Sequence, residues 1–115
     1  MQLDHVALNV ADRETSAAFY AEYFGLTRRV HDDPDRLIIS GAEGGLLALV
    51  ERGHVDAKLS ASIHFGLRAE SPEAVRELRE RFAAAGVEEV EWQDDGISRV
   101  QVRDPDGYLV EAYSY

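Results

Sequence analysis

Apolar and polar residues alternate along residues 3–10, which predicts a half-buried strand whose polar face carries His5, Ala7 and Asn9. Asp12 then precedes a run of aromatic residues at helical spacing that stops at Gly25, and this pattern predicts an α-helix with an acidic N-cap and a glycine C-cap. Three further strands are predicted over residues 26–30, 36–40 and 46–51. The first half of the chain therefore has the order strand, helix and three strands.

The same order of elements returns beyond a polar segment of about residues 54–60. A strand that begins at Ile63 is followed by a helix with Ser71 as its N-cap, Pro72 at its first position and Gly86 after its last turn. The apolar stripe of this helix comprises Val75, Leu78, Phe82 and Ala85. Strands are then predicted over residues 87–93, 98–103 and 108–113, with a hairpin turn at residues 94–96.

These elements predict an α+β fold made of two tandem βαβββ modules, which is an internal repeat. Module 1 spans about residues 1–53, the linker about 54–60 and module 2 about 61–115, and we expect them to form a single domain. Each module has one strand face that carries polar side chains. We therefore expect the strands to build a curved mixed sheet around a cleft lined by those faces.

The composition limits the chemistry and the partners. The chain has 115 residues and no cysteine, which excludes disulfides, a thiolate nucleophile and thiolate-bound metal sites. Its formal net charge of -10 disfavours binding to nucleic acid or to an anionic membrane. Neither a signal peptide nor an apolar run of membrane-spanning length is evident, so we expect a cytoplasmic protein. The expected partner is a small-molecule substrate.

Three residues with metal-binding side chains fall at related positions of the repeat. His5 and His64 occupy the first strands of the two modules, and Glu111 lies in the last strand of module 2. Each of them alone has an ordinary structural explanation, but a carboxylate within an apolar strand is rarely buried unless it is paired or bound to a metal. Two imidazoles and one carboxylate suit iron, manganese, nickel, cobalt or zinc. The sequence predicts one divalent metal per site without distinguishing among these ions.

Other polar side chains share the predicted inner face and are candidates for contact with a substrate. They are Asn9, Arg68, Arg99, Gln101 and Arg103, with Trp92 near the rim. Arginine can hold a carboxylate or enolate oxygen through two parallel hydrogen bonds, although an arginine on an edge strand is often only a solvated charge. Arg68 is the strongest candidate, because it follows His64 on the same strand face. The candidates for a general base are Glu51, Glu91 and Tyr113.

The repeated module and three motifs together are typical of a known family. The motifs are Leu3-Asp4-His5-Val6-Ala7-Leu8-Asn9-Val10, the helix ending Phe19-Tyr20 to Phe24-Gly25-Leu26, and Asp104-Pro105-Asp106-Gly107-Tyr108 with Glu111. The chain thus resembles the vicinal oxygen chelate superfamily, which has the glyoxalase, bleomycin resistance and dioxygenase fold. Its members include glyoxalase I, extradiol dioxygenases, fosfomycin-resistance thiol transferases, methylmalonyl-CoA epimerase and bleomycin-binding proteins. The resemblance implies a metal that binds two adjacent oxygens of a substrate.

The resemblance also implies which residues hold the metal, namely His5, His64 and Glu111. Glyoxalases and epimerases of this superfamily add a fourth protein ligand on the last strand of module 1. Alignment of the two halves places Leu49 there, and Glu51 follows it on the same face. A three-ligand site is similar instead to those of the extradiol dioxygenases and fosfomycin enzymes. Short relatives form homodimers whose sites lie across the interface, and the same arrangement is implied here.

Two classes of function follow from these observations. The first is a divalent-metal-dependent lyase, isomerase or dioxygenase that acts on a small oxygen-chelating substrate. The second is a metal-free acidic protein that sequesters a cationic drug such as bleomycin, which the net charge of -10 favours and the intact triad opposes. A fosfomycin-type thiol transferase is a minor alternative, because Ala7, Glu91 and Gln101 are poorly suited to hold a phosphonate.

Overall fold

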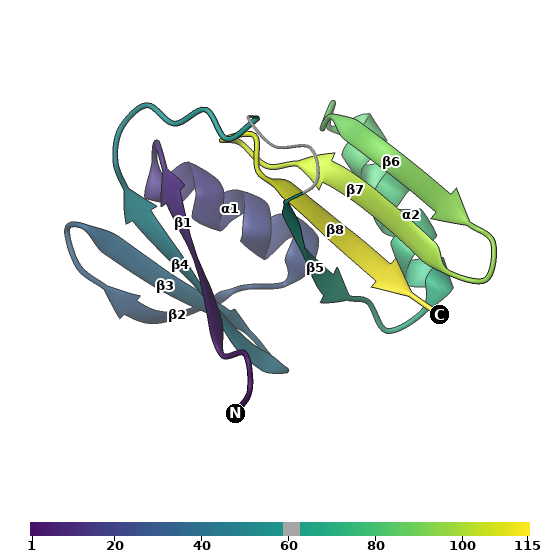
Figure 1. Cartoon of the computed structure of the whole chain (residues 1–115), viewed down its shortest axis with the longest axis horizontal. Coiled ribbons are helices and arrows are strands. Elements are labelled where there is room, and N and C mark those ends of the chain that lie inside the picture. The colour runs from purple at the N-terminus through teal and green to yellow at the C-terminus, as the bar shows by residue number, and fades with distance from the viewer. Residues whose placement is uncertain (59–62) are drawn as a thin grey trace. The chain divides into compact units, whose positions relative to one another are not determined.

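Residues 1–58 and 63–115 are described by the computed structural model, and the chain divides into two units, Met1–Asp56 and Ala57–Tyr115. The end of the predicted linker and the start of module 2 fall partly on residues 59–62, which lie outside the described residues. Each unit contains one βαβββ module (Figure 1). The predicted pair of modules is therefore confirmed.

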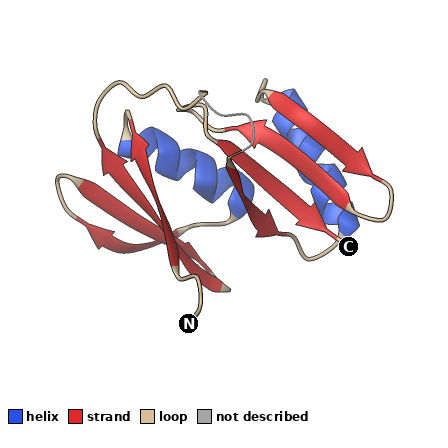
Figure 2. Cartoon of the chain, in the orientation of Figure 1, coloured by secondary structure: helices blue, strands red, loops and turns tan. Residues whose placement is uncertain are grey.

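The elements of the first unit are β1 (His5–Val10), α1 (Arg13–Phe24), β2 (Arg28–Asp32), β3 (Arg36–Gly41) and β4 (Gly44–Glu51). Those of the second unit are β5 (His64–Arg68), α2 (Pro72–Ala84), β6 (Glu89–Asp94), β7 (Ser98–Arg103) and β8 (Leu109–Ser114). Their strand orders are β1-β4-β3-β2 and β5-β8-β7-β6. In each sheet the first strand runs parallel to the last, and the other neighbours are antiparallel. Each unit therefore has one helix and one mixed sheet (Figure 2).

Helix α1 begins and ends as the sequence predicts. The Asp12 carboxylate accepts a hydrogen bond of 2.7 Å from the backbone N–H of Thr15, and this bond lowers the pKa of Asp12. Gly25 ends the helix with a φ of 68°, a left-handed conformation that glycine adopts without a steric penalty. The helix packs on β3 and β4, with the ring of Tyr20 fully buried. The core of this unit therefore lies between α1 and one face of its sheet.

Helix α2 covers the corresponding face of the second sheet. Ser71 caps it by accepting a 3.1 Å hydrogen bond from the backbone N–H of Ala74. Val75, Leu78 and Phe82 are buried against β7 and β8, as the sequence predicts. Ala85, which the sequence also assigns to the apolar stripe, is exposed because it is the C-cap residue, where the helical spacing stops. Within the described residues, neither helix has the length and apolar character needed to cross a membrane.

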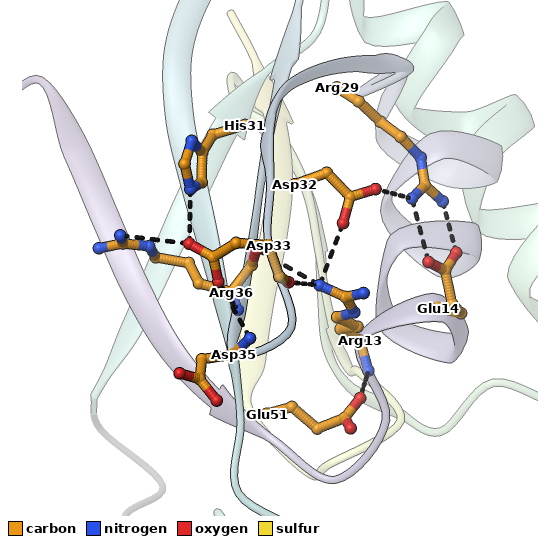
Figure 3. A network of polar contacts seen from close by, with 9 residues as sticks. All are labelled: Arg13, Glu14, Arg29, His31, Asp32, Asp33, Asp35, Arg36 and Glu51. Carbon is orange, nitrogen blue, oxygen red and sulfur yellow. Dashed lines mark hydrogen bonds and ion pairs between the residues drawn. The ribbon is translucent and has the colours of Figure 1, made fainter.

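A polar network ties the β2–β3 hairpin of the first unit to the start of α1 (Figure 3). The Arg13 guanidinium lies 3.1 Å from the Asp32 carboxylate and donates to the carbonyl oxygen of Asp33. His31 lies 2.6 Å from the carboxylate of Asp33, and the backbone N–H groups of Asp35 and Arg36 donate to that same side chain. These contacts, the His31 contact first, lower the pKa of Asp33 to about 2. The hairpin is thus held as a charged, hydrogen-bonded surface.

A smaller network joins α2 to the β6–β7 hairpin of the second unit. The Arg76 guanidinium donates two hydrogen bonds to the Asp94 carboxylate, at 2.9 and 3.0 Å, and the hydroxyl of Ser98 donates a third at 2.5 Å. The Arg76 contact is the main cause that lowers the pKa of Asp94 to about 2. The charged form of Asp94 is therefore favoured by folding.

Truncation of the largest buried side chain of α2 should destabilise the second unit. We expect Phe82→Ala to lower the free energy of unfolding by about 3–5 kcal/mol, because it removes a fully buried ring and leaves a cavity beside β7 and β8. The neighbouring exposed change Arg81→Ala is the control and should cost less than about 0.5 kcal/mol. Urea unfolding followed by circular dichroism measures both. Equal losses in the two variants would contradict this packing.

Asp94 should make stability depend on acid pH. Its folded-state pKa of about 2 is below the ordinary value of 3.8, so its contribution is complete above about pH 4 and disappears as the pH falls through about 2. The stability difference between the wild type and Asp94→Asn should therefore shrink between pH 4 and pH 2, as measured by unfolding at several pH values. Asp95→Asn, whose carboxylate accepts from Gln93 rather than from an arginine, is the control and should show a flatter difference.

Candidate metal and substrate site

The sheet face of the second unit that is turned away from α2 carries most of the predicted site. Val100, Val102, Val110 and Ala112 are buried on the face that α2 covers, so the residues that alternate with them lie on the other face. Strand pairing arranges those residues in three rows across the sheet. The histidine row is His64, Leu109 and Arg103; the glutamate row is Gly66, Glu111, Gln101 and Glu91; the arginine row is Arg68, Tyr113, Arg99 and Gln93.

The Glu111 carboxylate is the centre of this face. Its side chain is only 13% exposed, and its Oε2 atom accepts a 3.0 Å hydrogen bond from the side-chain amide of Gln101. Nε2 of His64 lies 3.5 Å from the same oxygen, and Nε of Arg99 lies 4.0 Å from it. A largely buried carboxylate is therefore held by one amide and flanked by an imidazole and a guanidinium.

Gly66 makes room for this carboxylate. A Cβ atom at Gly66 would lie 2.8 Å from Cγ and 3.0 Å from Oε1 of Glu111, closer than such atoms approach in proteins. A glycine inside a strand often marks a place where another group approaches the backbone closely. The absence of a side chain at Gly66 therefore fixes where the Glu111 side chain can lie. The sequence analysis did not single out Gly66, although its place two residues beyond His64 was a usable signal.

The turn before β8 places Glu111 in this row. The Asp104 carboxylate accepts two hydrogen bonds of 2.9 Å, from the backbone N–H groups of Asp106 and Tyr108. Gly107 has a φ of 97°, a backbone conformation that residues other than glycine rarely adopt. This turn sets the register in which β8 enters the sheet between β5 and β7.

The corresponding face of the first unit contains only one of the predicted ligands. His5 has a side chain that is 62% exposed, and its Nδ1 lies 3.5 Å from the carboxylate of Asp4. Ala7 and Asn9 follow His5 on the same face and are also exposed. No carboxylate occupies the position that matches Glu111, so this face is less polar than its counterpart.

The strand register corrects the alignment of the two modules. Alignment on the glycines before the last strands placed Leu49 opposite Glu111. The strand pairing shows a different equivalence. Ala7, two residues after His5, pairs with Ala48, whereas Gly66, two residues after His64, pairs with Glu111. Ala48 is therefore the counterpart of Glu111, whereas Leu49 is fully buried in the core on the α1 side. The error arose because the alignment matched Gly45 to Gly107, whereas the register matches Gly44 to it: Ile38 and Ala48 are ten residues apart, as are Gln101 and Glu111.

Two other predicted residues lie on the helix-covered faces. Glu51 pairs with the buried Val10, and its carboxylate accepts a 3.0 Å hydrogen bond from the backbone N–H of Arg13 at the start of α1. Trp92 pairs with the buried Val100, and its ring lies 4.5 Å beneath the guanidinium carbon of Arg79 in α2. Trp92 is therefore not near the rim of the polar face, because it follows Glu91, which lies on that face, and successive side chains of a strand point to opposite faces.

The remaining candidates lie on the polar face. Arg103 in the histidine row donates a 2.8 Å hydrogen bond to the carbonyl oxygen of Gly107 and lies 3.6 Å from the Glu88 carboxylate, so it braces the turn before β8. Glu91 accepts a hydrogen bond from Arg99. The guanidinium carbon of Arg68 lies 4.9 Å from the centre of the Tyr115 ring.

His64 and Glu111 fit a shared divalent metal. Two ligand atoms of one such ion lie about 3 Å apart, because each metal–ligand bond is about 2.0–2.2 Å long. The separation of 3.5 Å between Nε2 of His64 and Oε2 of Glu111 is close to this value. Within residues 1–58 and 63–115, however, no group of three or more His, Asp or Glu side chains is gathered to hold a metal ion. The second unit alone therefore offers two of the three predicted ligands.

Comparison with known proteins identifies the family. Residues 2–112 match the family model of the Glyoxalase/Bleomycin resistance protein/Dioxygenase superfamily. The chain belongs to this superfamily. The resemblance drawn from the sequence motifs is thus confirmed, and the repeated βαβββ module is the fold of the superfamily.

Solved structures of the superfamily share this fold over nearly the whole chain. A possible glyoxalase from Bacillus cereus has 25% sequence identity and a TM-score of 0.83, and the match covers 99% of both chains. The fosfomycin resistance protein FosX from Listeria monocytogenes has 22% identity and a TM-score of 0.82, with coverage of 100% of this chain and 93% of that chain. Lactoylglutathione lyase from Agrobacterium tumefaciens has 22% identity and a TM-score of 0.74, with coverage of 97% and 92%. No curated protein matches the sequence.

The contact between Gly66 and Glu111 can be tested by a double-mutant cycle. We expect Gly66→Ala to lower the free energy of unfolding by about 1–3 kcal/mol, because the added Cβ must displace the Glu111 side chain. In the Glu111→Ala background the same change should cost nothing or stabilise by roughly 0.5–1 kcal/mol, the ordinary gain of alanine over glycine in a strand. Chemical unfolding measures all four proteins. A cost that is the same in both backgrounds would show that Gly66 serves some purpose other than room for Glu111.

Proposed function

We propose that this chain is a divalent-metal-dependent enzyme that acts on a small substrate through two adjacent oxygen atoms. The observation that carries the proposal is the Glu111 carboxylate, which is largely buried on a polar sheet face with His64 3.5 Å away. Burial of a carboxylate is unfavourable unless a cation or hydrogen-bond donors compensate it. The Gln101 amide supplies one donor, and a metal shared with His64 would supply the rest.

The proposed ligands are His64, Glu111 and His5, which together are a set of two imidazoles and one carboxylate. A divalent ion bound there acts as a Lewis acid on substrate oxygens. This donor set accepts iron, manganese, nickel, cobalt or zinc. FosX, which shares the fold, has been solved with Mn(II), which makes manganese the first ion to test.

The side chains around Glu111 have distinct roles in this proposal. The Gln101 amide donates to Oε2 of Glu111 and so orients the carboxylate, and the same oxygen, 3.5 Å from Nε2 of His64, would bind the metal. Glu91, which pairs with Arg99, is one candidate to accept a proton from the substrate. Tyr113, on the same strand face as Glu111, is the alternative proton carrier. Glu51 is not included, because its carboxylate is bound to the start of α1.

The proposed enzyme is a homodimer in which His5 of one protomer joins His64 and Glu111 of its partner. Two observations support this arrangement. The second unit supplies two ligands, His64 and Glu111, and the third proposed ligand, His5, belongs to the first unit. In addition, Ile38, Leu46 and Val50 remain only half-buried on the face that carries His5. Such an apolar surface favours contact with another copy of the chain.

The second candidate function is metal-free binding of a cationic drug. The net charge of -10 favours this function, since an acidic protein attracts cations from solution. It requires neither the pair of His64 and Glu111 nor a bound metal. The metal content of the purified protein therefore separates the two candidates.

Elemental analysis of untagged protein, purified anaerobically, should show about one divalent metal per chain. Glu111→Ala and His64→Ala should each lose roughly nine-tenths or more of it, because each removes a proposed ligand. Glu91→Ala, which removes a carboxylate from the same row but not a proposed ligand, is the matched control and should keep the metal. Absence of metal from the wild type, even after reconstitution with Mn(II), would reject the enzyme in favour of the binding protein.

Mixing of two inactive variants tests the shared site. His5→Ala and Glu111→Ala homodimers should each bind metal poorly, because every site in them lacks one ligand. After exchange of protomers, a heterodimer should contain one intact site and one that lacks both ligands, so metal binding should return to about half of the wild-type level on a heterodimer basis. Measurement of Mn(II) binding by electron paramagnetic resonance follows this recovery. No recovery would place each site within a single chain.

A further inference from the structure

The arginine row of the second unit has chemistry that the proposed metal site does not use. Arg68 and Arg99 lie on either side of Tyr113, one row beyond Glu111 on the same sheet face. We propose that these two arginines form a subsite for an acidic group of the substrate, a carboxylate or a phosphonate, in addition to the oxygens at the metal. The inference rests on the proposed function only for the metal-binding end of the substrate.

The position of the Arg99 guanidinium supports this subsite. The side chain is 28% exposed and reaches from its own row toward the glutamate row, where it pairs with Glu91 and has Nε 4.0 Å from Oε2 of Glu111. That Nε–H group is buried and has no hydrogen-bond acceptor within residues 1–58 and 63–115. A buried donor without an acceptor is unfavourable, and most such groups in proteins are bonded to the protein, to water or to a ligand. An oxygen atom of a substrate held beside Glu111 would be an acceptor for it.

Arg68 presents its guanidinium in a different way. It is exposed at the edge strand β5, and its guanidinium carbon lies 4.9 Å from the centre of the Tyr115 ring. The Tyr115 ring in turn stacks on that of Tyr113, with ring centres 6.3 Å apart. Stacking on an aromatic face orients a guanidinium but leaves the N–H groups at its edge available for an acidic ligand. Among the described residues, no carboxylate pairs with Arg68.

The charge of the site favours an anion once a metal is bound. The two arginines contribute two positive charges and a divalent ion two more, against one negative charge each from Glu91 and Glu111, which leaves a net charge of +2. The whole chain carries -10, so this face would be a positive region on an acidic protein. A substrate with only neutral groups would leave this charge unbalanced, whereas an acidic substrate would neutralise it.

The spacing of the rows indicates how the substrate would lie. Residues two apart along a strand are separated by about 7 Å, and strands that flank a common neighbour by about 10 Å. An acidic group between Arg68 and Arg99 would therefore lie about 7 Å from the glutamate row. The Arg99 side chain reaches back toward the glutamate row, so a short hydroxy diacid bound to the metal could bring its second acidic group to it. Guanidinium groups match both carboxylate and phosphonate oxygens, so both classes fit.

Three probes with the same metal-binding end test the subsite. L-Lactate lacks a second acidic group, L-malate has a carboxylate there, and 2-hydroxy-3-phosphonopropanoate has a phosphonate. We expect L-malate or the phosphonate to bind the Mn(II)-loaded protein about tenfold or more tightly than L-lactate, as measured by calorimetry. Arg68→Gln and Arg99→Gln should each remove most of this preference without lowering Mn(II) content. The preferred probe assigns the acidic group.

Arg81→Gln is the matched control. It removes the same charge from an exposed arginine of α2, the helix that covers the opposite face of the sheet, and should keep the full preference. Equal affinities for all three probes in the Mn(II)-loaded wild type would overturn the subsite and leave the metal site intact. A preference that falls equally in Arg81→Gln would also overturn it, because the effect would then come from overall charge.

Failure of the proposed function would be recognised separately. If the wild type takes up no Mn(II), the enzyme proposal fails, and the subsite is tested on the metal-free protein by nuclear magnetic resonance. The Nε–H resonance of Arg99 should then move on addition of L-malate but not of the neutral polyol glycerol, because only the former supplies a carboxylate to that buried donor. An Arg99 resonance unaffected by L-malate and by the phosphonate would overturn the subsite as well.

Discussion

The parallel pairing of β5 with β8 is the constraint on which the candidate site depends. It places Gly66 directly beside Glu111, and the absence of a Cβ atom there leaves the carboxylate its position. The antiparallel pairing of β8 with β7 adds Gln101 on the other side, where its amide donates to that carboxylate. A shift of either pairing by one residue would turn Glu111 into the core under α2, so register and site are inseparable.

The two modules show how one backbone can carry two different surfaces. Both have the first strand parallel to the last and a helix over one face. At the positions of Gly66, Glu111 and Gln101, the first module has Ala7, Ala48 and Ile38. The carboxylate and the amide that orients it are thus both replaced by apolar side chains. The first module keeps its histidine but not the environment that would bury and orient a carboxylate.

The charges of the chain are unevenly organised. Most acidic side chains that contact arginines do so at exposed hairpins and helix surfaces, where Arg13, Arg29 and Arg76 are examples. Such exposed pairs orient the hairpins more than they stabilise the fold, since solvent screens them. The face around Glu111 differs because Arg99 lies beside a largely buried carboxylate. The net charge of -10 therefore describes the surface as a whole and not this face.

The local elements were determined by the sequence itself. Asp12 and Gly25 bound the first helix, Ser71 and Pro72 begin the second, and the turn from Asp104 to Gly107 precedes the last strand, because capping and turn preferences act between neighbouring residues. The alternation of polar and apolar residues likewise assigned His64, Glu111 and Gln101 to one face. Their order along the chain also revealed the repeated module, and with it the family.

Tertiary structure decided what depends on register and on close packing. Glu51 and Trp92 contact the helices: Glu51 shares the face of the buried Leu49, and Trp92 lies on the opposite side of β6 from Glu91. Ala48, and not Leu49, is the residue of the first module that is equivalent to Glu111. Pairing between strands decides this equivalence, and the position of a glycine in the chain does not. A glycine two residues beyond His64 in a strand signals that some group approaches the backbone closely, but only the pairing of β5 with β8 shows that this group is Glu111.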